Sequence, residues 1–370
     1  QWYSIHTGLP YDTHRVFHLT DGARAGHRDV FDRLRAAGRS VASFASMNVA
    51  PFAGDGALYL GDPWTEQGDA HPPAYNAYNR FVSAQVREYS NASQPLSAAD
   101  TLKFVAFMAG HGLSAQTVSR ILAQLAREKT GDPRLSWKRV QLLDRLQFDV
   151  FRAAWRKRRP DFATFFSNSV AHVQHSYWRH MDPDAFTVRP EASELAVYGN
   201  AVRDAYVATD RLLGDFLKLA QAENITLMFA TALSQQPFLR HEETGGQHFH
   251  RLHNVTAFLN EAHVAFVEVK PTMTHQYMLR CADPAARDAA RAALAGYRLA
   301  DGRQVFGFPA VDGDPAQLYF GCQIASATAP DTKVVDGRGQ ETAFAKLFYP
   351  IAAIKSGRHH PDGCLWIQSA

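Results

Sequence analysis

The sequence predicts an α/β fold in which a central sheet is flanked by helices and carries a helical insertion. Residues 29–37 form a helical pattern that ends at Gly38, and the run 40–45 follows as a strand. Helix, glycine and strand in this order are the repeating unit of an α/β sheet. Residues 225–230 form a wholly apolar strand of the kind buried in parallel sheets, and residues 75–158 read as helical throughout.

The composition is that of a globular protein. The chain has 370 residues, of which 46% are hydrophobic and 20% are charged, so it is long enough for a large core and too apolar for disorder. The net charge is only +3, and the one basic run, 156–159, ends a predicted helix, where cations complement the helix dipole. We therefore expect no nucleic-acid partner.

Three cysteines stand far apart without a CxxC pair, which argues against a disulfide scaffold and against a structural zinc site. No apolar run approaches the roughly 20 residues that a membrane-spanning helix needs, so no transmembrane segment is expected. No signal peptide is recognisable, and a cytoplasmic location is favoured over export.

The remaining elements are expected in the following order. Residues 1–22 and 48–75 are loops rich in Gly and Pro, and residues 75–158 are an all-helical insertion packed on the sheet. Its apolar stripes lie at 102, 105, 106 and 109, at 118, 121, 122 and 125, and at 140, 143, 146, 150 and 151. A strand within 161–170, a polar segment at 171–183 and a helix at 191–221 follow. Strands at 264–269, 275–280, 317–323 and 364–368 and a helix at 284–296 complete a single domain over 1–370, whose residues 263–350 form a smaller α/β subregion.

Histidines gather just after a predicted buried strand, at His172, His175 and His180. Ligands of open α/β sheets bind beyond the carboxyl ends of the strands, and neutral imidazoles are good ligands for zinc and similar metals. His172 and His175 are three residues apart and can share one helical face. The alternative is that these are hydrogen-bonded core histidines beside Tyr177 and Trp178.

A second group, His359, His360 and Asp362, lies between Gly357 and Gly363, just before the last predicted strand. Two imidazoles and a carboxylate in a tight loop supply metal ligands or acid–base groups. The alternative is a surface turn with incidental histidines.

A third group comprises His248, His250 and His253, whose spacing suits a metal site on a flexible loop. Polar and apolar residues alternate here, with the apolar Phe249 between His248 and His250. We therefore favour a solvated loop that leads into a helix from about residue 252.

Five segments, in order, resemble the alkaline phosphatase superfamily, in particular its type I phosphodiesterase and nucleotide pyrophosphatase branch. They are Trp2 to Pro10 with His14, Phe31 to Phe44, Ala171 to Trp178, Tyr206 to Leu213 and Gly357 to Leu365. The first, third and fifth resemble the family's W-x-S-x-x-TG-x-x-P-x-x-HG, D-x-x-x-H-x-x-W and G-x-H-x-P-x-G-x-L motifs. The resemblance implies an alkaline phosphatase-like central sheet and a small phosphorylated or related ester as substrate, with hydrolysis or transfer of a phosphodiester or phosphomonoester. It also implies a divalent metal, zinc or manganese, with His175 and His359 as ligands. The catalytic nucleophile is expected upstream of Gln1.

The chain departs from the family pattern at metal-binding positions. Ala171 stands where the motif has Asp, and Thr231 to Ser234 reads T-A-L-S where the family has S-D-H-G. Two imidazoles do not suffice for two divalent ions, because catalytic zinc takes about three protein ligands.

Three hypotheses therefore compete. One metal is held by His175, His359 and a neighbour, His172 or His360. Alternatively, imidazoles act as acid and base without metal beside Arg179 or Arg358. In the third, the chain is a catalytically degenerate relative that binds a phosphorylated or sulfated ligand or a protein partner. A partner surface on the helical insertion would appear as an exposed apolar stripe between residues 97 and 158.

Overall fold

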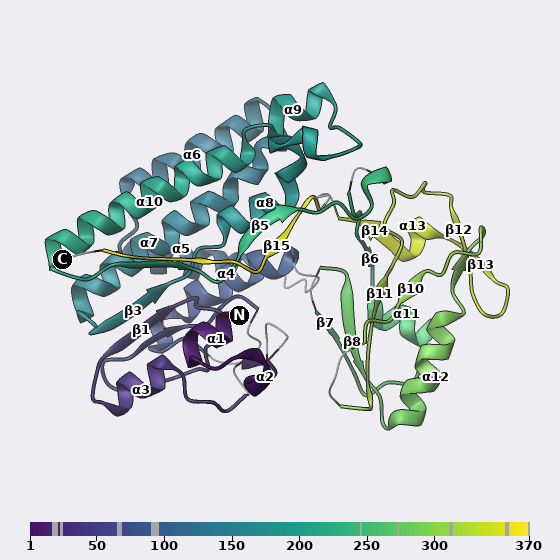
Figure 1. The fold of residues 1–370 in the computed structure, drawn as a ribbon, viewed down its shortest axis with the longest axis horizontal. Helices are drawn as coiled ribbons and strands as arrows, with labels where there is room; N and C mark the ends of the chain where they lie inside the picture. The colour runs from purple at the N-terminus through teal and green to yellow at the C-terminus, as the bar shows by residue number, and fades with distance from the viewer. Residues whose placement is uncertain are drawn as a thin grey trace.

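The computed structural model describes residues 1–16, 21–22, 25–64, 69–89, 96–244, 246–272, 274–310, 314–351 and 355–368. Its fold is mixed α/β with several small sheets. Figure 1 shows two lobes. The larger lobe contains most of the helices and also the last two strands of the chain, and the smaller lobe is built from residues 250–350.

The sheet of the larger lobe is parallel and has three strands in the order β2-β1-β3. They are β1 (Val41–Phe44), β2 (Leu58–Leu60) and β3 (Phe162–Phe165). All four residues of β1 are buried. Val41 packs with Phe31 of α3 (Val30–Ala36), whereas Phe44 packs with residues of the helical insertion, so helices cover both faces of this sheet.

Only helices and their connections stand between β2 and β3 in the described part of the chain. They are η2 (Pro73–Tyr75), α4 (Asn76–Tyr89), α5 (Ala98–Gly110), α6 (Ala115–Thr130), η3 (Pro133–Lys138) and α7 (Arg139–Arg158). Two of the three predicted apolar stripes do not face the core: Leu102 and Leu122 are 70% and 61% exposed. The third, at 140–151, is confirmed, because Val150 and Phe151 are buried in the core and Leu143 and Leu146 pack against it. Helix α5 instead buries Phe104, Phe107 and Met108, whose larger side chains remove more apolar surface from water.

Helices occupy the segment after β3. They are α8 (Ser169–Met181), η4 (Pro183–Ala185), α9 (Ala192–Tyr198) and α10 (Ala201–Glu223). The polar segment 171–183 is largely α8, in which Val173 supplies a buried contact to Ala201 and Val202 of α10. The single helix expected over 191–221 is split at Gly199 and Asn200.

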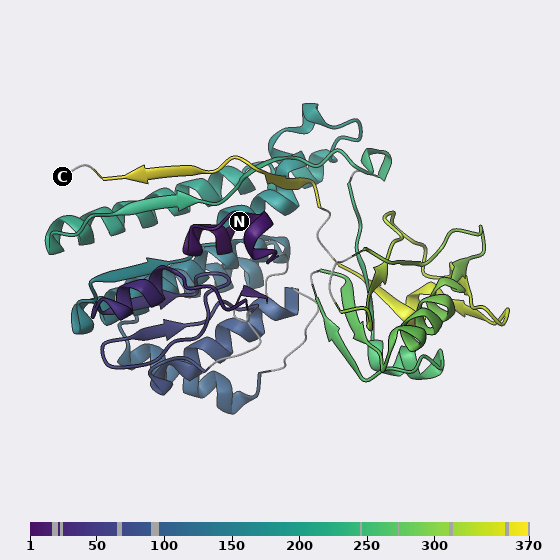
Figure 2. The same cartoon turned by 60° about the horizontal axis from the view of Figure 1, so that its bottom comes forward.

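A long two-stranded ribbon runs beside α10 (Figure 2). Strands β4 (Met228–Thr231) and β5 (Ser234–Pro237) pair antiparallel with β16 (Cys364–Ile367) and β15 (Gly357–His360). The one central sheet expected from the sequence is not formed by the described residues, since β3 pairs only with β1 and β4 only with β16. With one unpaired edge, β4 is not the buried strand expected at 225–230, and Met228 is 58% exposed.

The N-terminal residues, expected to be an irregular loop, form two short helices, α1 (Trp2–Thr7) and α2 (Tyr11–His14). Helix α1 lies between β3 and the ribbon. The ring of Trp2 packs edge-on against Phe166, just after β3, and the Gln1 side-chain amide donates a hydrogen bond to the carbonyl of Pro361, just after β15.

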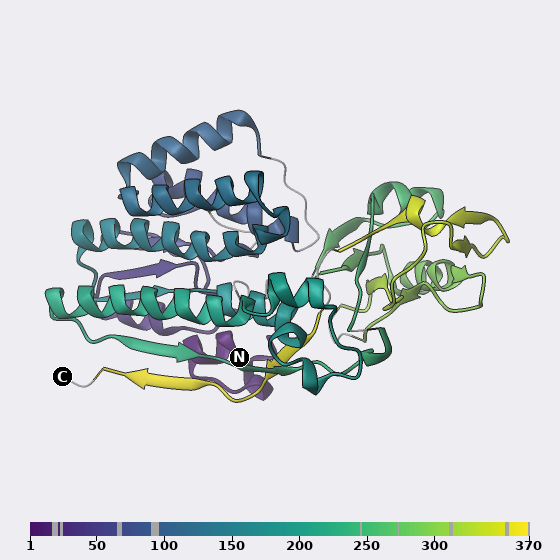
Figure 3. The ribbon, with the colours of Figure 1, turned by 90° about the horizontal axis from the view of Figure 1, so that it is seen from above.

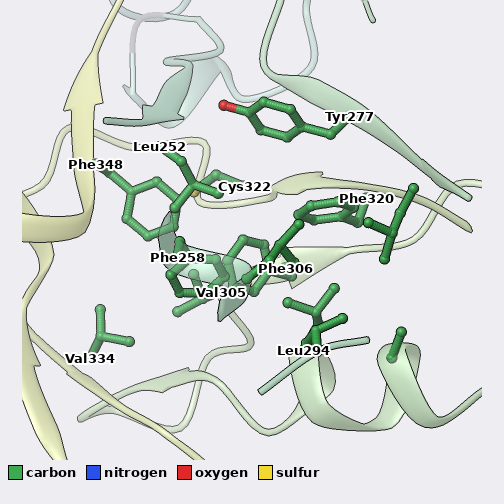
Figure 4. Close-up of a cluster of buried hydrophobic side chains, with 14 of the residues drawn as sticks. Leu252, Phe258, Tyr277, Leu294, Val305, Phe306, Phe320, Cys322, Val334 and Phe348 are labelled. Carbon is green, nitrogen blue, oxygen red and sulfur yellow. The ribbon is translucent and has the colours of Figure 1, made fainter. Parts of the chain in front are cut away.

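The smaller lobe has its own apolar core, in which Phe306, Phe320 and Phe348 are fully buried (Figure 4). Its elements are β6 (His250–Leu252), α11 (Val255–Glu261), β7 (Glu268–Pro271), β8 (Gln276–Arg280), α12 (Pro284–Ala295), β9 (Arg298–Leu299), β10 (Phe306–Gly307), β11 (Gln317–Cys322), β12 (Lys333–Val335), β13 (Glu341–Ala343), α13 (Phe344–Leu347) and β14 (Phe348–Pro350), and a short η5 (Glu242–Thr244) precedes them. The main sheet has the order β10-β11-β8-β7. No helix in the described ranges is long and apolar enough to cross a membrane.

Candidate functional site

The site begins with a break in helix α8. Tyr177 has non-helical backbone angles, and the helix bends there. Ser356 takes over the interrupted helical bonds: its backbone N–H donates to the His175 carbonyl at 2.8 Å, and its hydroxyl accepts from the Arg179 N–H and donates to the Ser176 carbonyl. A side chain inserted into the helical ladder is an established cause of a bend. Ser356 is completely buried, so this connection fixes β15 against α8.

Gly357 brings the two elements into close contact. A Cβ at this position would lie 2.3 Å from the Gln174 carbonyl oxygen, so only glycine fits. The Gly357 carbonyl accepts a hydrogen bond from His175 Nδ1 at 2.9 Å. A carbonyl only accepts, so Nδ1 carries the proton and Nε2 of the neutral ring holds a lone pair.

His359 completes the pair of imidazoles. It lies directly opposite Gln235 in the β15–β5 pair, on the same face of the ribbon. Its ring meets that of His175 edge-to-face, with 4.6 Å between the centroids. The Gln235 amide nitrogen lies 3.2 Å from His359 Nδ1 and 3.4 Å from His175 Nε2. Since an amide nitrogen only donates, both ring nitrogens accept, and two lone pairs converge on one NH₂ group.

The surroundings keep both rings neutral. Burial lowers the pKa of His175 to about 4, with smaller contributions from His359 and Lys355. The pKa of His359 is lowered by partial burial and then by the Lys355 charge. Burial also lowers the pKa of Lys355 itself, whose ammonium packs 5.0 Å from the ring centre of Phe238. Neutral rings are available as ligands without competition from protons.

The site fits one metal ion in part and does not fit two. In the present orientation the Gln235 amide oxygen is buried without a hydrogen-bond partner in the described residues. A half turn of the amide would bring that oxygen to the point where the two lone pairs converge, giving two nitrogens and one oxygen as ligands. No group of three His, Cys, Asp or Glu side chains in the described ranges could hold an ion. Ala171, one turn before His175, and Ala232 supply no carboxylate, whose negative charge would balance paired divalent ions.

Of the secondary candidates, the structure directs His360, Arg358 and Arg179 elsewhere, whereas His172 is close enough to His175 to contribute to the lowering of its pKa. His360 and Arg358 alternate with His359 along β15 and so point to the opposite face. His360 faces Asp362, with 3.7 Å between Nδ1 and the carboxylate. Arg179 is buried and ion-paired with Glu194 at 3.2 Å. His172 lies one turn before His175 on α8, where burial lowers its pKa.

The third histidine group is structural. His250, expected in a solvated loop, lies in β6 and is only 3% exposed, and its Nδ1 bonds to the Ile324 carbonyl. His253 Nε2 bonds to the Ala345 carbonyl. The apolar neighbours of His250 in the smaller lobe's core account for this burial, since it packs edge-on against Phe344.

A hydroxyl–imidazole contact in the N-terminal helices has the wrong tautomer for nucleophile activation. Ser4 Oγ lies 2.9 Å from His14 Nε2. However, His14 Nδ1 accepts from the Val16 N–H, so Nε2 carries the proton and donates to Ser4. A general base needs a free lone pair toward the hydroxyl, so this pair is a structural contact.

Three residues of the site were not predicted from the sequence: Gln235, Lys355 and Ser356. Gln235 follows the apolar run 225–230 by only a few residues, and the rule that sites lie beyond strand ends could have drawn attention to it. Lys355 and Ser356 carry no sequence signal, because their roles depend on the contact between β15 and α8. Comparison with family models, with curated proteins and with solved structures gives no match for this chain.

Proposed function

We propose that this protein hydrolyses or transfers phosphate esters at a site formed by His175, Gln235 and His359, with one divalent zinc or manganese ion as its metal. The observation that carries the proposal is the convergence of two imidazole lone pairs, from α8 and β15, on the single amide group of Gln235. Lone pairs that meet at one point suit a cation, and three protein ligands are usual for a catalytic zinc ion.

The pKa of about 4 for His175 favours a ligand over an acid–base role. A general base works best when its pKa is near the working pH, and this ring is far below neutrality. A metal ligand, by contrast, must be unprotonated. A bound divalent ion would polarise the phosphoryl oxygens of an ester.

This chain's own residues have defined tasks in the proposal. The Gly357 carbonyl orients His175 through Nδ1, as carbonyls that accept from the other ring nitrogen do for metal-bound histidines. Lys355 contributes a positive charge close enough to both rings to lower their pKa values. The same charge would attract the anionic group of a phosphate ester.

An alkaline phosphatase-like central sheet is part of this proposal. In the described residues β3 and β4 each have one partner, and α1 is seated between the end of β3 and the ribbon. One further strand paired with both β3 and β4 would join the parallel sheet and the ribbon into one sheet. It would also cover the exposed Met228.

Metal analysis and turnover test the proposal together. We expect about one equivalent of zinc or manganese per chain of purified protein. The ion should be lost in His175→Ala and in His359→Ala. Turnover of bis(4-nitrophenyl) phosphate and of 4-nitrophenyl phosphate should fall with it.

The matched control is His360→Ala, which removes the neighbouring imidazole on the opposite face of β15. It should keep both the metal and the activity. Protein that binds no metal stoichiometrically and turns over neither ester would overturn the proposal.

A second candidate is a binding protein without turnover. The observation that favours it is the Gln235 NH₂ group itself, which already satisfies both imidazoles without a metal. Such a protein would bind a phosphorylated or sulfated ligand, and its affinity for 4-nitrophenyl phosphate would not depend on added zinc.

A further inference from the structure

A cationic cavity lies between helices of the larger lobe, and no residue that lines it belongs to the histidine site. Its volume is about 380 Å³, and α6, α7 and α10 supply most of the lining. Helix α7 packs against both of the others, and Figure 3 shows the helical layer from above.

The lining carries an excess of positive charge. Five basic side chains face the cavity, against two acidic ones, Asp144 and Asp204. The basic residues are Arg120, Arg127, Lys138, Arg145 and Arg211. This excess is large for a chain whose whole net charge is +3.

Most of this charge is not neutralised by neighbours. Lys138 pairs with Asp204 and Arg145 with Asp215. Arg120, Arg127 and Arg211 form no ion pair in the part of the chain that the structure describes. Arg127 and Arg211 are exposed and Arg120 is half-buried, so these three unpaired cations are accessible to an anion that enters the cavity.

Buried polar groups in the same lining lack partners. Gln141 Nε2, Arg145 Nε and Thr209 Oγ1 have no hydrogen bond to any described residue. Arg145 is more than nine-tenths buried, with 8% of its surface exposed. Buried donors are usually satisfied in native proteins, so these three groups are available to hydrogen-bond a polar molecule in the cavity.

We propose that this cavity binds a small phosphorylated molecule, a phosphomonoester with an organic group of about the size of a sugar. Arginine forks match the geometry of phosphate oxygens and bind them in bidentate fashion. The volume is near the lower end for small-molecule sites, with room for more than a bare phosphate ion. The polar donors of Gln141 and Thr209 suit oxygens of the organic group.

Calorimetric titration of the full chain with glucose 6-phosphate, inorganic phosphate, glucose and citrate tests the proposal. We expect glucose 6-phosphate to bind more tightly than phosphate, and glucose and citrate to bind weakly or not at all. Arg211→Gln and Arg120→Gln should each raise the dissociation constant about tenfold, since each removes a hydrogen bond to a charged group. Thr209→Val, which changes no charge, should weaken the binding of glucose 6-phosphate more than the binding of inorganic phosphate.

The matched control is Arg203→Gln, which removes an exposed arginine of α10 outside the lining. It should bind like the unaltered chain, and thermal melts without ligand show whether each variant is folded. No glucose 6-phosphate binding at millimolar concentration, an equal loss in Arg203→Gln, or equally tight citrate binding would overturn the proposal. None of these readouts involves metal or turnover, so they stand apart from the test of the histidine site.

Discussion

His175 and Gly357 hold one another in place: His175 Nδ1 donates to the Gly357 carbonyl at 2.9 Å, and Gly357 has no Cβ to keep the two apart. The ring is thereby fixed in the tautomer that turns the Nε2 lone pair toward Gln235 and His359. The chemistry proposed for this site therefore depends on the close approach of a strand to a bent helix.

Gly357→Ala should disrupt this approach. The new methyl group would meet the Gln174 carbonyl at 2.3 Å, so β15 must move away from α8. We expect a loss of about 1–3 kcal/mol in the free energy of unfolding, measured by urea denaturation, and weaker zinc binding. Gly214→Ala is the control, because its Cβ would meet nothing within 4 Å in the middle of α10. It should be neutral or stabilising by about 1 kcal/mol, as alanine favours helices.

Ser356→Ala should destabilise the protein by another route. It leaves the Arg179 N–H and the Ser176 carbonyl without their buried partner. An unsatisfied buried group costs about 1–3 kcal/mol, which chemical denaturation resolves. Ser356→Thr tests volume instead, because it keeps the hydroxyl and adds a methyl group at a completely buried position. Equal unfolding free energies for Ser356→Ala and the unaltered protein would show that the helix bend has another cause.

The local sequence pattern predicts those helices and strands whose limits are set by residues close to them in the sequence. The helix at Val30–Ala36, the strand at Val41–Phe44 and the helix at Pro284–Ala295 were expected within a residue or two. Capping and breaking residues such as Asp29 and Gly38 fix them locally.

Pairings between distant segments were not predicted. The run 225–230 was expected to form a strand of the kind buried in parallel sheets, but its strand pairs antiparallel with β16, from the far end of the chain. For the candidate site, His175 and His359 could be proposed from motif spacing. The position of Gln235 after a predicted strand could have drawn attention to it, but its contact with both imidazoles depends on the cross-strand register that sets it opposite His359.

Ala171→Asp should strengthen metal binding. Positions 171 and 175 are one helical turn apart on α8, so the new carboxylate would share a face with His175. A hard, negative oxygen ligand beside the two imidazoles should lower the zinc or manganese dissociation constant about tenfold or more. Competition with a chromogenic chelator measures this. Ala171→Asn is the matched control, because it has the same size without the charge. An equal gain in both variants would refute an electrostatic role for the carboxylate.

The orientation of α5 and α6 can be tested by comparing an inner and an outer apolar residue. Phe104 is buried, so Phe104→Ala should cost about 3–5 kcal/mol of unfolding free energy. Leu122 is 61% exposed, so Leu122→Gln should change stability by less than about 0.5 kcal/mol. If Leu122, Leu102 and Val105 form a partner surface, Leu122→Gln should also reduce self-association, seen by analytical ultracentrifugation. A large loss of stability in Leu122→Gln would contradict the observed packing.

Asp144 should make stability fall as the pH rises. Burial raises the pKa of its carboxyl to about 6, although hydrogen bonds from Ser167 and Ser169 act in the opposite direction. Between the unfolded pKa of 3.8 and the folded value, the folded state holds a proton that the unfolded state has lost. Stability contributed by this group is therefore complete below the unfolded pKa and is lost by about pH 6, with a total of about 3 kcal/mol at most.

Buried histidines such as His175 change the stability in the opposite direction over the same pH range. Comparison with Asp144→Asn therefore isolates the contribution of Asp144. The folded pKa of His175 is lowered to about 4, so its contribution to stability increases as the pH rises. The Asn side chain does not titrate but can still accept from the two serines. Its stability relative to the unaltered protein should therefore increase between pH 4 and pH 7, as measured by urea denaturation. Asp210→Asn, an exposed change on α10, should differ from the unaltered protein by less than about 0.5 kcal/mol at both pH values. A pH-independent difference for Asp144→Asn would mean that the Asp144 carboxyl is ionised throughout, with the two serine hydroxyl groups compensating for its burial.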